Sequence, residues 1–259
     1  MRSLLTALAM FVIAAQASAT TQFAGTVTHA DGTTSTYVAT DADDDGIPES
    51  ISVNGGAAVP TPPGQETNVP TTGGRTVTVV NGTSGNDAAN EATNTNPAVF
   101  FGGNGNDTFS GSPQGDSMHG GDGSDTLHGG PGNVRDEGWG GNNDDTLGGE
   151  GRNDDGGNDD YHGGDGRDTL RGGTGNDHLT GDGGGDKLYG GCGDDTIDDT
   201  YANDGIDTVK AGTGADTIAT NDHDGSDSVD LGNDTDKDTL TRDTGDNVSH
   251  RKGNDVVNP

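Results

Sequence analysis

The sequence has 259 residues, of which 25% are hydrophobic, 4% are aromatic and 49 are glycine. A conventional globular core needs roughly 45–50% apolar residues, so a large hydrophobic core is excluded. The 44 acidic residues outnumber the 12 basic ones and give a net charge of -32, which opposes compaction unless cations neutralise it. The same charge argues against nucleic acid and anionic membranes as partners, since both need a basic patch. Composition alone therefore indicates disorder unless a repeated pattern and a bound cation replace the missing core.

Residues Met1–Ala19 have the features of a secretory signal peptide. Arg2 supplies the positive charge, Leu4–Ala15 is mostly apolar, and Ala17-Ser18-Ala19 gives the small-x-small cleavage pattern. The apolar stretch is too short for an ordinary transmembrane helix and no longer hydrophobic run follows it, so a retained membrane anchor is the less favoured alternative. We expect cleavage after Ala19, an extracellular mature protein and no insertion into a membrane.

Residues 20–59 form a separate small unit. Gln22–Thr28 and Ser35–Thr40 alternate loosely between polar and apolar residues on either side of Asp31-Gly32, a pattern that predicts a β-hairpin. Residues 60–74, with four prolines, have the composition of a linker.

An acidic loop follows the predicted hairpin. Asp41, Asp43 and Asp45 stand at alternate places before Gly46, and Glu49 lies three residues further on. The run resembles the calcium loop of EF-hand, dockerin and thrombospondin type 3 proteins. The twelfth loop place is Ser52 where an EF-hand has Glu, and no helix signal flanks the loop. The alternative to a calcium site is an acidic turn.

The segment from Arg75 to Val80 predicts a strand that opens a repeat domain over residues 75–259, and Phe100 and Phe101 are expected to cap its stack. Within it, Gly163–Asp198 holds four consecutive nine-residue units with Gly at the first and fourth places, Asp at the sixth and a large aliphatic residue at the eighth. Glycine permits positive φ and close backbone approach, so six residues can turn tightly. The last three residues form a minimal strand with the eighth side chain pointing inward. The expected turn glycines are Gly102, Gly105, Gly120, Gly123, Gly163, Gly166, Gly172, Gly175, Gly181, Gly184, Gly190 and Gly193.

This pattern resembles the RTX, or hemolysin-type, calcium-binding nonapeptide repeat. The resemblance implies an all-β fold, a parallel β-roll (solenoid), with several Ca²⁺ ions held between turns eighteen residues apart. It pairs Asp159 with Asp177, Asp168 with Asp186, and Asp177 with Asp195. Calcium takes six to eight oxygen ligands, which the acidic residues at this fixed phase can supply. The expected ligands are Asp107, Asp116, Asp125, Asp159, Asp168, Asp177, Asp186, Asp195 and Asp216, together with Asp41, Asp43, Asp45 and Glu49 of the acidic loop.

The period is irregular over 129–157 and again after residue 198. Asp136, Asp145 and Leu147 echo the motif, whereas Trp139 does not fit it, and an insertion in a solenoid is expected to leave the stack as a loop. The intervals after Asp198 lengthen, which predicts looser coils.

The sequence contains no His-Glu-x-x-His or Gly-x-Ser-x-Gly motif, and the part outside the repeats is too small for most enzymes. His119, His128 and His162 at ninth places and His178 at a seventh are expected to be solvated surface residues rather than a zinc site. Tyr161 is expected to pack against the coil. The single cysteine, Cys192, excludes an intramolecular disulfide.

We therefore expect a secreted, non-catalytic calcium-binding protein whose β-roll folds on binding calcium. One alternative is a calcium-rigidified adhesin or matrix element at the cell surface, whose partner the sequence does not identify. A third is a non-catalytic remnant or accessory of an RTX toxin or hydrolase.

Overall fold

The computed structural model describes residues 21–29, 31, 33–41, 46–71, 75–149, 156–201, 205–221, 223, 227–249 and 255–258. These residues form strands and turns only, and none of them lies in a helix long and apolar enough to cross a bilayer. The predicted signal peptide, residues 1–19, lies outside the described residues.

The strands form three sheets. An antiparallel four-stranded sheet contains β1 (Thr21–Thr28), β2 (Thr34–Asp41), β3 (Ser50–Val53) and β4 (Val59–Pro60). An eleven-stranded sheet contains β5 (Gln65–Pro70), β6 (Thr76–Asn81), β8 (Ala98–Asn104), β10 (Ser117–Asp122), β12 (Glu137–Asn142), β14 (Asp160–Asp165), β16 (His178–Gly183), β18 (Thr196–Asp198), β20 (Thr217–Thr220), β22 (Thr239–Arg242) and β24 (Val256–Asn258). A nine-stranded sheet contains β7 (Ala88–Asn90), β9 (Thr108–Ser110), β11 (Thr126–His128), β13 (Thr146–Leu147), β15 (Thr169–Thr174), β17 (Lys187–Cys192), β19 (Thr208–Thr213), β21 (Ser228–Asp230) and β23 (Asn247–Ser249).

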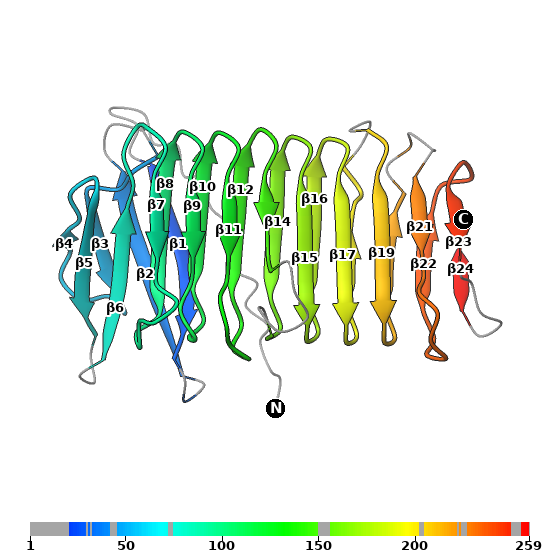
Figure 1. Ribbon diagram of the computed structural model, residues 1–259, viewed down its shortest axis with the longest axis horizontal. Helices are drawn as coiled ribbons and strands as arrows, with labels where there is room; N and C mark the ends of the chain where they lie inside the picture. The colour runs from blue at the N-terminus through cyan, green and yellow to red at the C-terminus, as the bar shows by residue number, and fades with distance from the viewer. Residues whose placement is uncertain are drawn as a thin grey trace.

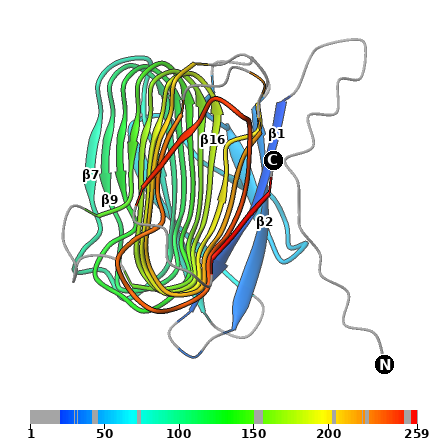
Figure 2. The same cartoon turned by 90° about the vertical axis from the view of Figure 1, so that its right-hand side faces the viewer.

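From β6 onward the chain alternates between the two large sheets and climbs along the long axis of the molecule (Figure 1). Seen along that axis, the coils superimpose as a flattened roll, with β1 and β2 beside it (Figure 2). Each repeat strand pairs in parallel with the strand two positions further on, as Asp160 opposite His178 and Thr169 opposite Lys187 illustrate. The fold is the predicted parallel β-roll.

The eighth-place side chains fill the narrow space between the two large sheets. Leu170, Leu179 and Leu188 are fully buried and belong to one continuous cluster that runs from Ala98 to Leu240. Because strand side chains alternate, one apolar residue from each short strand is enough for this interior. At Gly138 the ring of Tyr161 takes the space of the missing side chain, since a Cβ there would lie 2.9 Å from the Tyr161 ring.

The four-stranded sheet packs on the outer face of the roll and forms a second core. Tyr37 and Ile51 of this sheet share the core with Val79, Val99 and Phe101 of the roll. The prediction that Phe100 and Phe101 cap the stack is wrong. Consecutive strand residues point to opposite faces, so Phe100 lies inside the roll, stacked on Phe109 with 4.8 Å between ring centroids, and Phe101 points into the second core.

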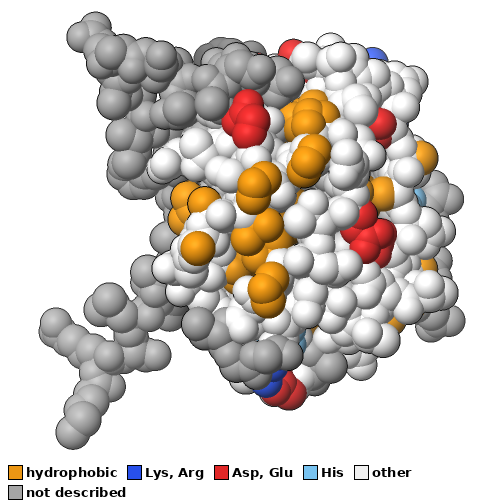
Figure 3. Space-filling view, turned by 90° about the vertical axis from the view of Figure 1, so that its left-hand side faces the viewer, with side chains coloured by type: hydrophobic (Ala, Val, Ile, Leu, Met, Phe, Trp, Pro, Cys, Tyr) orange, Lys and Arg blue, Asp and Glu red, His pale blue; other side chains and the backbone are white. Residues whose placement is uncertain are grey.

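The linker predicted over 60–74 is also incorrect, because residues 65–70 form β5. This strand pairs antiparallel with β6, and Val69, opposite Val77, is buried in the second core. β5 is an edge strand that ends at Pro70, a position where proline costs no sheet hydrogen bond. Figure 3 faces this end of the molecule, where several hydrophobic side chains are visible at the surface.

The irregular segment keeps more of the repeat than the sequence predicts. Strands β12 and β13 stay in register with their neighbours, and Trp139 occupies an outward position on β12 opposite His119 and His162. Residues 150–155 lie outside the described part.

His119 is buried under β1 and β2 instead of solvated, and its Nε2 lies 2.7 Å from the Tyr37 hydroxyl oxygen. Burial lowers the pKa of His119 to about 3, so its ring is neutral.

Candidate metal centre

The sixth-place aspartates form two buried columns along the roll. Each aspartate immediately precedes a strand, so parallel stacking of the strands places these residues directly above one another. The first column lies where the strands of the nine-stranded sheet begin and contains Asp107, Asp125, Asp145, Asp168, Asp186, Asp207, Asp227 and Asp246. The second lies where those of the eleven-stranded sheet begin and contains Asp116, Asp136, Asp159, Asp177, Asp195, Asp216, Asp238 and Asp255.

One carboxylate oxygen of each aspartate links neighbouring coils. The Asp159 amide donates to Asp177 Oδ1 at 2.9 Å, and the Asp177 amide donates to Asp195 Oδ1 at 2.9 Å. The Asp168 amide donates in the same way to Asp186 Oδ1 at 2.8 Å. These are the three pairs that the resemblance to the RTX repeat implies. The links lengthen to 3.3 Å at the C-terminal end, between Asp227 and Asp246 and between Asp238 and Asp255.

The second carboxylate oxygen points into the turn. Among the residues that the structure describes, the Oδ2 atoms of several column members are buried and accept no hydrogen bond, including those of Asp107, Asp125, Asp145, Asp168, Asp195 and Asp216. A buried anionic oxygen without a donor is costly. A cation beside it removes that cost, and a hard oxygen-binding cation suits this donor set.

The first-place glycines make the room in which these oxygens lie. A Cβ on Gly163 would lie 2.4 Å from Asp168 Oδ2 and 2.6 Å from the Gly181 carbonyl oxygen. Positive φ angles occur at the second and fourth places instead, as at Gly164 (104°) and Gly166 (153°). First-place glycines are therefore required by space, and the second- and fourth-place glycines by space and by backbone conformation. The donor set and the cavity around it both fit calcium.

We predict that Gly163→Ala weakens calcium binding and destabilises the roll, because its methyl group displaces Asp168 Oδ2. Gly185→Ala is the matched control, since a Cβ there lies no closer than 3.3 Å to any atom beyond its chain neighbours. Calcium titration of the two variants checks this. Equal affinities would show that the first-place cradle does not hold the ion.

Burial shifts the acidity of the columns in the absence of a cation. Desolvation raises the pKa of Asp145 and Asp195 to about 8 and that of Asp168 to about 7. Protons therefore compete with cations for these carboxylates near neutral pH.

The columns contain more aspartates than the ligand set that the repeat resemblance gave. Asp136, Asp145, Asp207, Asp227 and Asp238 are equally buried members. The signal for them was present, since each stands two residues before an inward position. The expected ligand set relied on regularly spaced glycines, and it therefore left out these aspartates, whose turns vary in length.

Asp199 was missed altogether. It is buried at the first place of the unit after Asp198, where the preceding units have glycine, and one of its oxygens lies within 4.8 Å of oxygens of Asp186 and Asp207. An acidic residue at the first place of a unit, where the preceding units have glycine, would have indicated this additional carboxylate.

The acidic loop is described only in part. Asp41 is buried and its Oδ2 accepts a hydrogen bond from the Gly46 amide at 3.0 Å, whereas the Glu49 side chain is exposed. Asp43 and Asp45 lie outside the described residues, so a calcium site in this loop stays a prediction.

Three segments match a known family model. Residues 101–134, 162–197 and 201–238 match the RTX calcium-binding nonapeptide repeat (4 copies). The third segment includes coils after residue 198 that the lengthened intervals predict to be looser. The matched repeats lie in the two aspartate columns, and together with the β-solenoid fold they indicate a calcium-binding β-roll. No curated protein matches the chain.

Proposed function

We propose that this chain is a secreted, non-catalytic protein whose β-roll binds several calcium ions and folds on binding them. The observation that carries the proposal is the set of buried Oδ2 atoms aimed into glycine-lined turns. Calcium supplies positive charge and accepts oxygen ligands from flexible surroundings. The aspartates would contribute Oδ2 as ligands, while Oδ1 holds the next coil through its amide. Secretion rests on the signal-peptide pattern of residues 1–19.

Equilibrium dialysis of the mature chain against radioactive calcium tests the binding. We expect several ions per molecule, bound cooperatively, because each coil contacts only its neighbours. Stoichiometry at or below one ion would contradict the proposal.

We predict that Asp177→Ala lowers both the calcium count and the stability of the roll. The change removes one carboxylate from the middle of a column and leaves the buried Asp159 amide without its acceptor, a loss of about 1–3 kcal/mol by itself. Asp165→Ala, at an exposed third place of the repeat, is the control with the same charge change. Asp255→Ala, at the end of the column with its 3.3 Å link, should have a smaller effect. Denaturant unfolding in calcium measures all three, and equal losses for Asp177→Ala and Asp165→Ala would exclude a special role for the column.

A further calcium ion is expected in the acidic loop at 41–49. Asp43→Ala combined with Asp45→Ala should remove about one bound ion and leave the roll folded, since ligand number sets affinity. Unchanged stoichiometry by calorimetry would make the loop an acidic turn.

A further inference from the structure

Two imidazoles and a carboxylate meet on the outer face of the eleven-stranded sheet, outside the aspartate columns. Asp160 and His162 are two residues apart on β14 and therefore share one face. His178 stands directly opposite Asp160 on the neighbouring strand β16. The parallel register thus brings together three side chains from two repeats whose sequences give no metal motif.

The geometry of the three groups matches that of a metal coordination sphere. His178 Nδ1 lies 2.8 Å and His162 Nε2 lies 3.3 Å from Asp160 Oδ1, and one ligand atom from each residue lies within 4.8 Å of the others. Tetrahedral zinc with bonds of 2.0–2.1 Å separates its ligand atoms by about 3.3 Å. Small side-chain rotations would therefore place all three atoms around one ion.

We propose that Asp160, His162 and His178 bind one Zn²⁺ ion. Imidazole nitrogen suits zinc and related transition metals, whereas calcium prefers oxygen ligands, so this site differs in chemistry from the columns. Three protein ligands leave a coordination position for water.

The remaining polar atoms of the three residues are oriented as in known zinc sites. Asp160 Oδ2 accepts a hydrogen bond from Arg135 Nη2 at 2.6 Å, which leaves Oδ1 directed at the imidazoles. His162 Nδ1 lies 3.9 Å from Asp182 Oδ2, so a carboxylate stands behind the ring nitrogen that does not face Asp160. Carboxylates placed behind metal-binding histidines fix the ring and increase its basicity.

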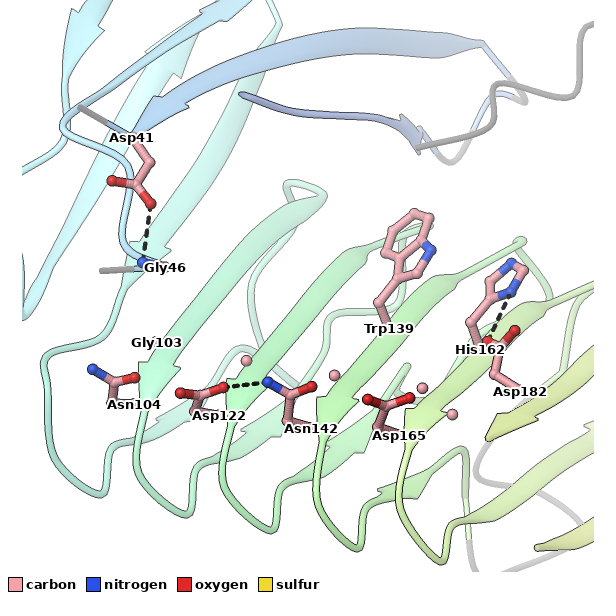
Figure 4. A pocket seen from close by; sticks show the side chains of 14 residues that line it. Asp41, Gly46, Gly103, Asn104, Asp122, Trp139, Asn142, His162, Asp165 and Asp182 are labelled. Atoms are coloured by element: carbon pink, nitrogen blue, oxygen red, sulfur yellow. Dashed lines mark hydrogen bonds and ion pairs between the residues drawn. The ribbon is translucent and has the colours of Figure 1, made fainter. Parts of the chain in front are cut away.

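The site is open to solution along a groove. The side chains of Asp160, His162 and His178 are 24%, 29% and 45% exposed. His162 and Asp182 line a groove of about 660 Å³ whose other side includes Asp41 and Gly46. Figure 4 shows Trp139 standing beside His162 on the same face. The Trp139 and His162 rings are stacked, with 6.0 Å between their centroids.

Trp139 is the only tryptophan of the chain and provides a direct optical probe of the site. A paramagnetic ion bound to His162 would quench its fluorescence. Cu²⁺ binds the same nitrogen and oxygen ligands as Zn²⁺, and more tightly, so it serves as the spectroscopic substitute.

The experiment uses the untagged mature chain with Cys192→Ser, because an exposed thiol binds zinc by itself. Calcium is kept saturating, so that the columns do not take up zinc. Calorimetry with zinc chloride should give one ion per chain, and Cu²⁺ should quench Trp139 with the same stoichiometry. His162→Ala, His178→Ala and Asp160→Asn should each lower the zinc affinity at least about tenfold, and Asp182→Asn about tenfold.

His128→Ala is the matched control, because His128 lies on the nine-stranded sheet and contacts the Gly148 carbonyl oxygen instead. It should leave zinc affinity and copper quenching unchanged. Circular dichroism verifies that each variant is folded. Where a histidine variant does not fold, the zinc affinity of the nearly isosteric Asp160→Asn tests the proposal. Failure of the parent chain to bind zinc saturably, or equal affinity in parent and Asp160→Asn, would overturn the proposal. The test is independent of the calcium stoichiometry, since it compares variants at one calcium concentration.

Discussion

Removal of calcium is expected to unfold the roll. Without a cation, the sixteen stacked aspartates of the two columns bring buried negative charge together, in a chain whose net charge is -32. One apolar side chain per strand cannot offset a backbone ordering cost of roughly 1–2 kcal/mol per residue. Binding free energy then becomes folding free energy, as in other small metal-dependent domains.

Circular dichroism and small-angle scattering across a calcium titration check this expectation. The mature chain should be expanded and poor in β-structure in chelator, and should become compact and β-rich at millimolar calcium, in the range of extracellular sites. Magnesium at equal concentration is the control, because it demands a smaller and more regular coordination sphere. A chelated chain that is already compact and unchanged by calcium would refute coupled folding. It would not refute calcium binding, which the dialysis experiment tests separately.

Protonation of the aspartate columns is expected to stabilise the calcium-free fold and so to substitute in part for calcium. In the cation-free fold, burial raises the pKa of Asp145 and Asp195 to about 8, of Asp168 to about 7, and of Asp125 and Asp216 to about 6. A pKa that is higher in the folded than in the unfolded chain means that the folded state binds more protons. This contribution to stability is complete below the ordinary value of 3.8 and is lost as the pH rises through about 6 to 8. The chelated protein should therefore gain β-structure on acidification from pH 8 towards pH 4.

In the calcium-loaded protein, acid is expected to weaken calcium binding and so to act against the fold. Calcium ligands must be deprotonated, so protons compete with the ion and calcium affinity falls as the pH decreases. Two pH series followed by circular dichroism and a calcium electrode, one in chelator and one in calcium, separate these effects. If the chelated chain showed no more β-structure at pH 4 than at pH 8, the protonated columns would not be a stabilising feature of the fold.

The repeat determined the roll because its information is local. Gly163, Asp168 and Leu170 recur every nine residues, so each unit by itself sets a turn, a carboxylate and one inward side chain. Stacking such units leads to a parallel solenoid whatever precedes it. The burial of the eighth-place residues followed from this period, whereas the pairing of Asp159 with Asp177 followed from the resemblance to the RTX repeat.

Tertiary structure alone decided what covers the outer face of the roll and which outward side chains meet. The local pattern of residues 65–70 does not predict a strand, and only pairing with β6 and burial of Val69 make it one. His119 and His162 occupy equivalent places in the repeat, yet β1 and β2 bury the first and leave the second at an open groove. The cluster of Asp160, His162 and His178 depends on register between separate coils. A nine-residue period determines the inward positions of each unit, whereas contacts on the outer face depend on side chains that the repeat leaves free to vary.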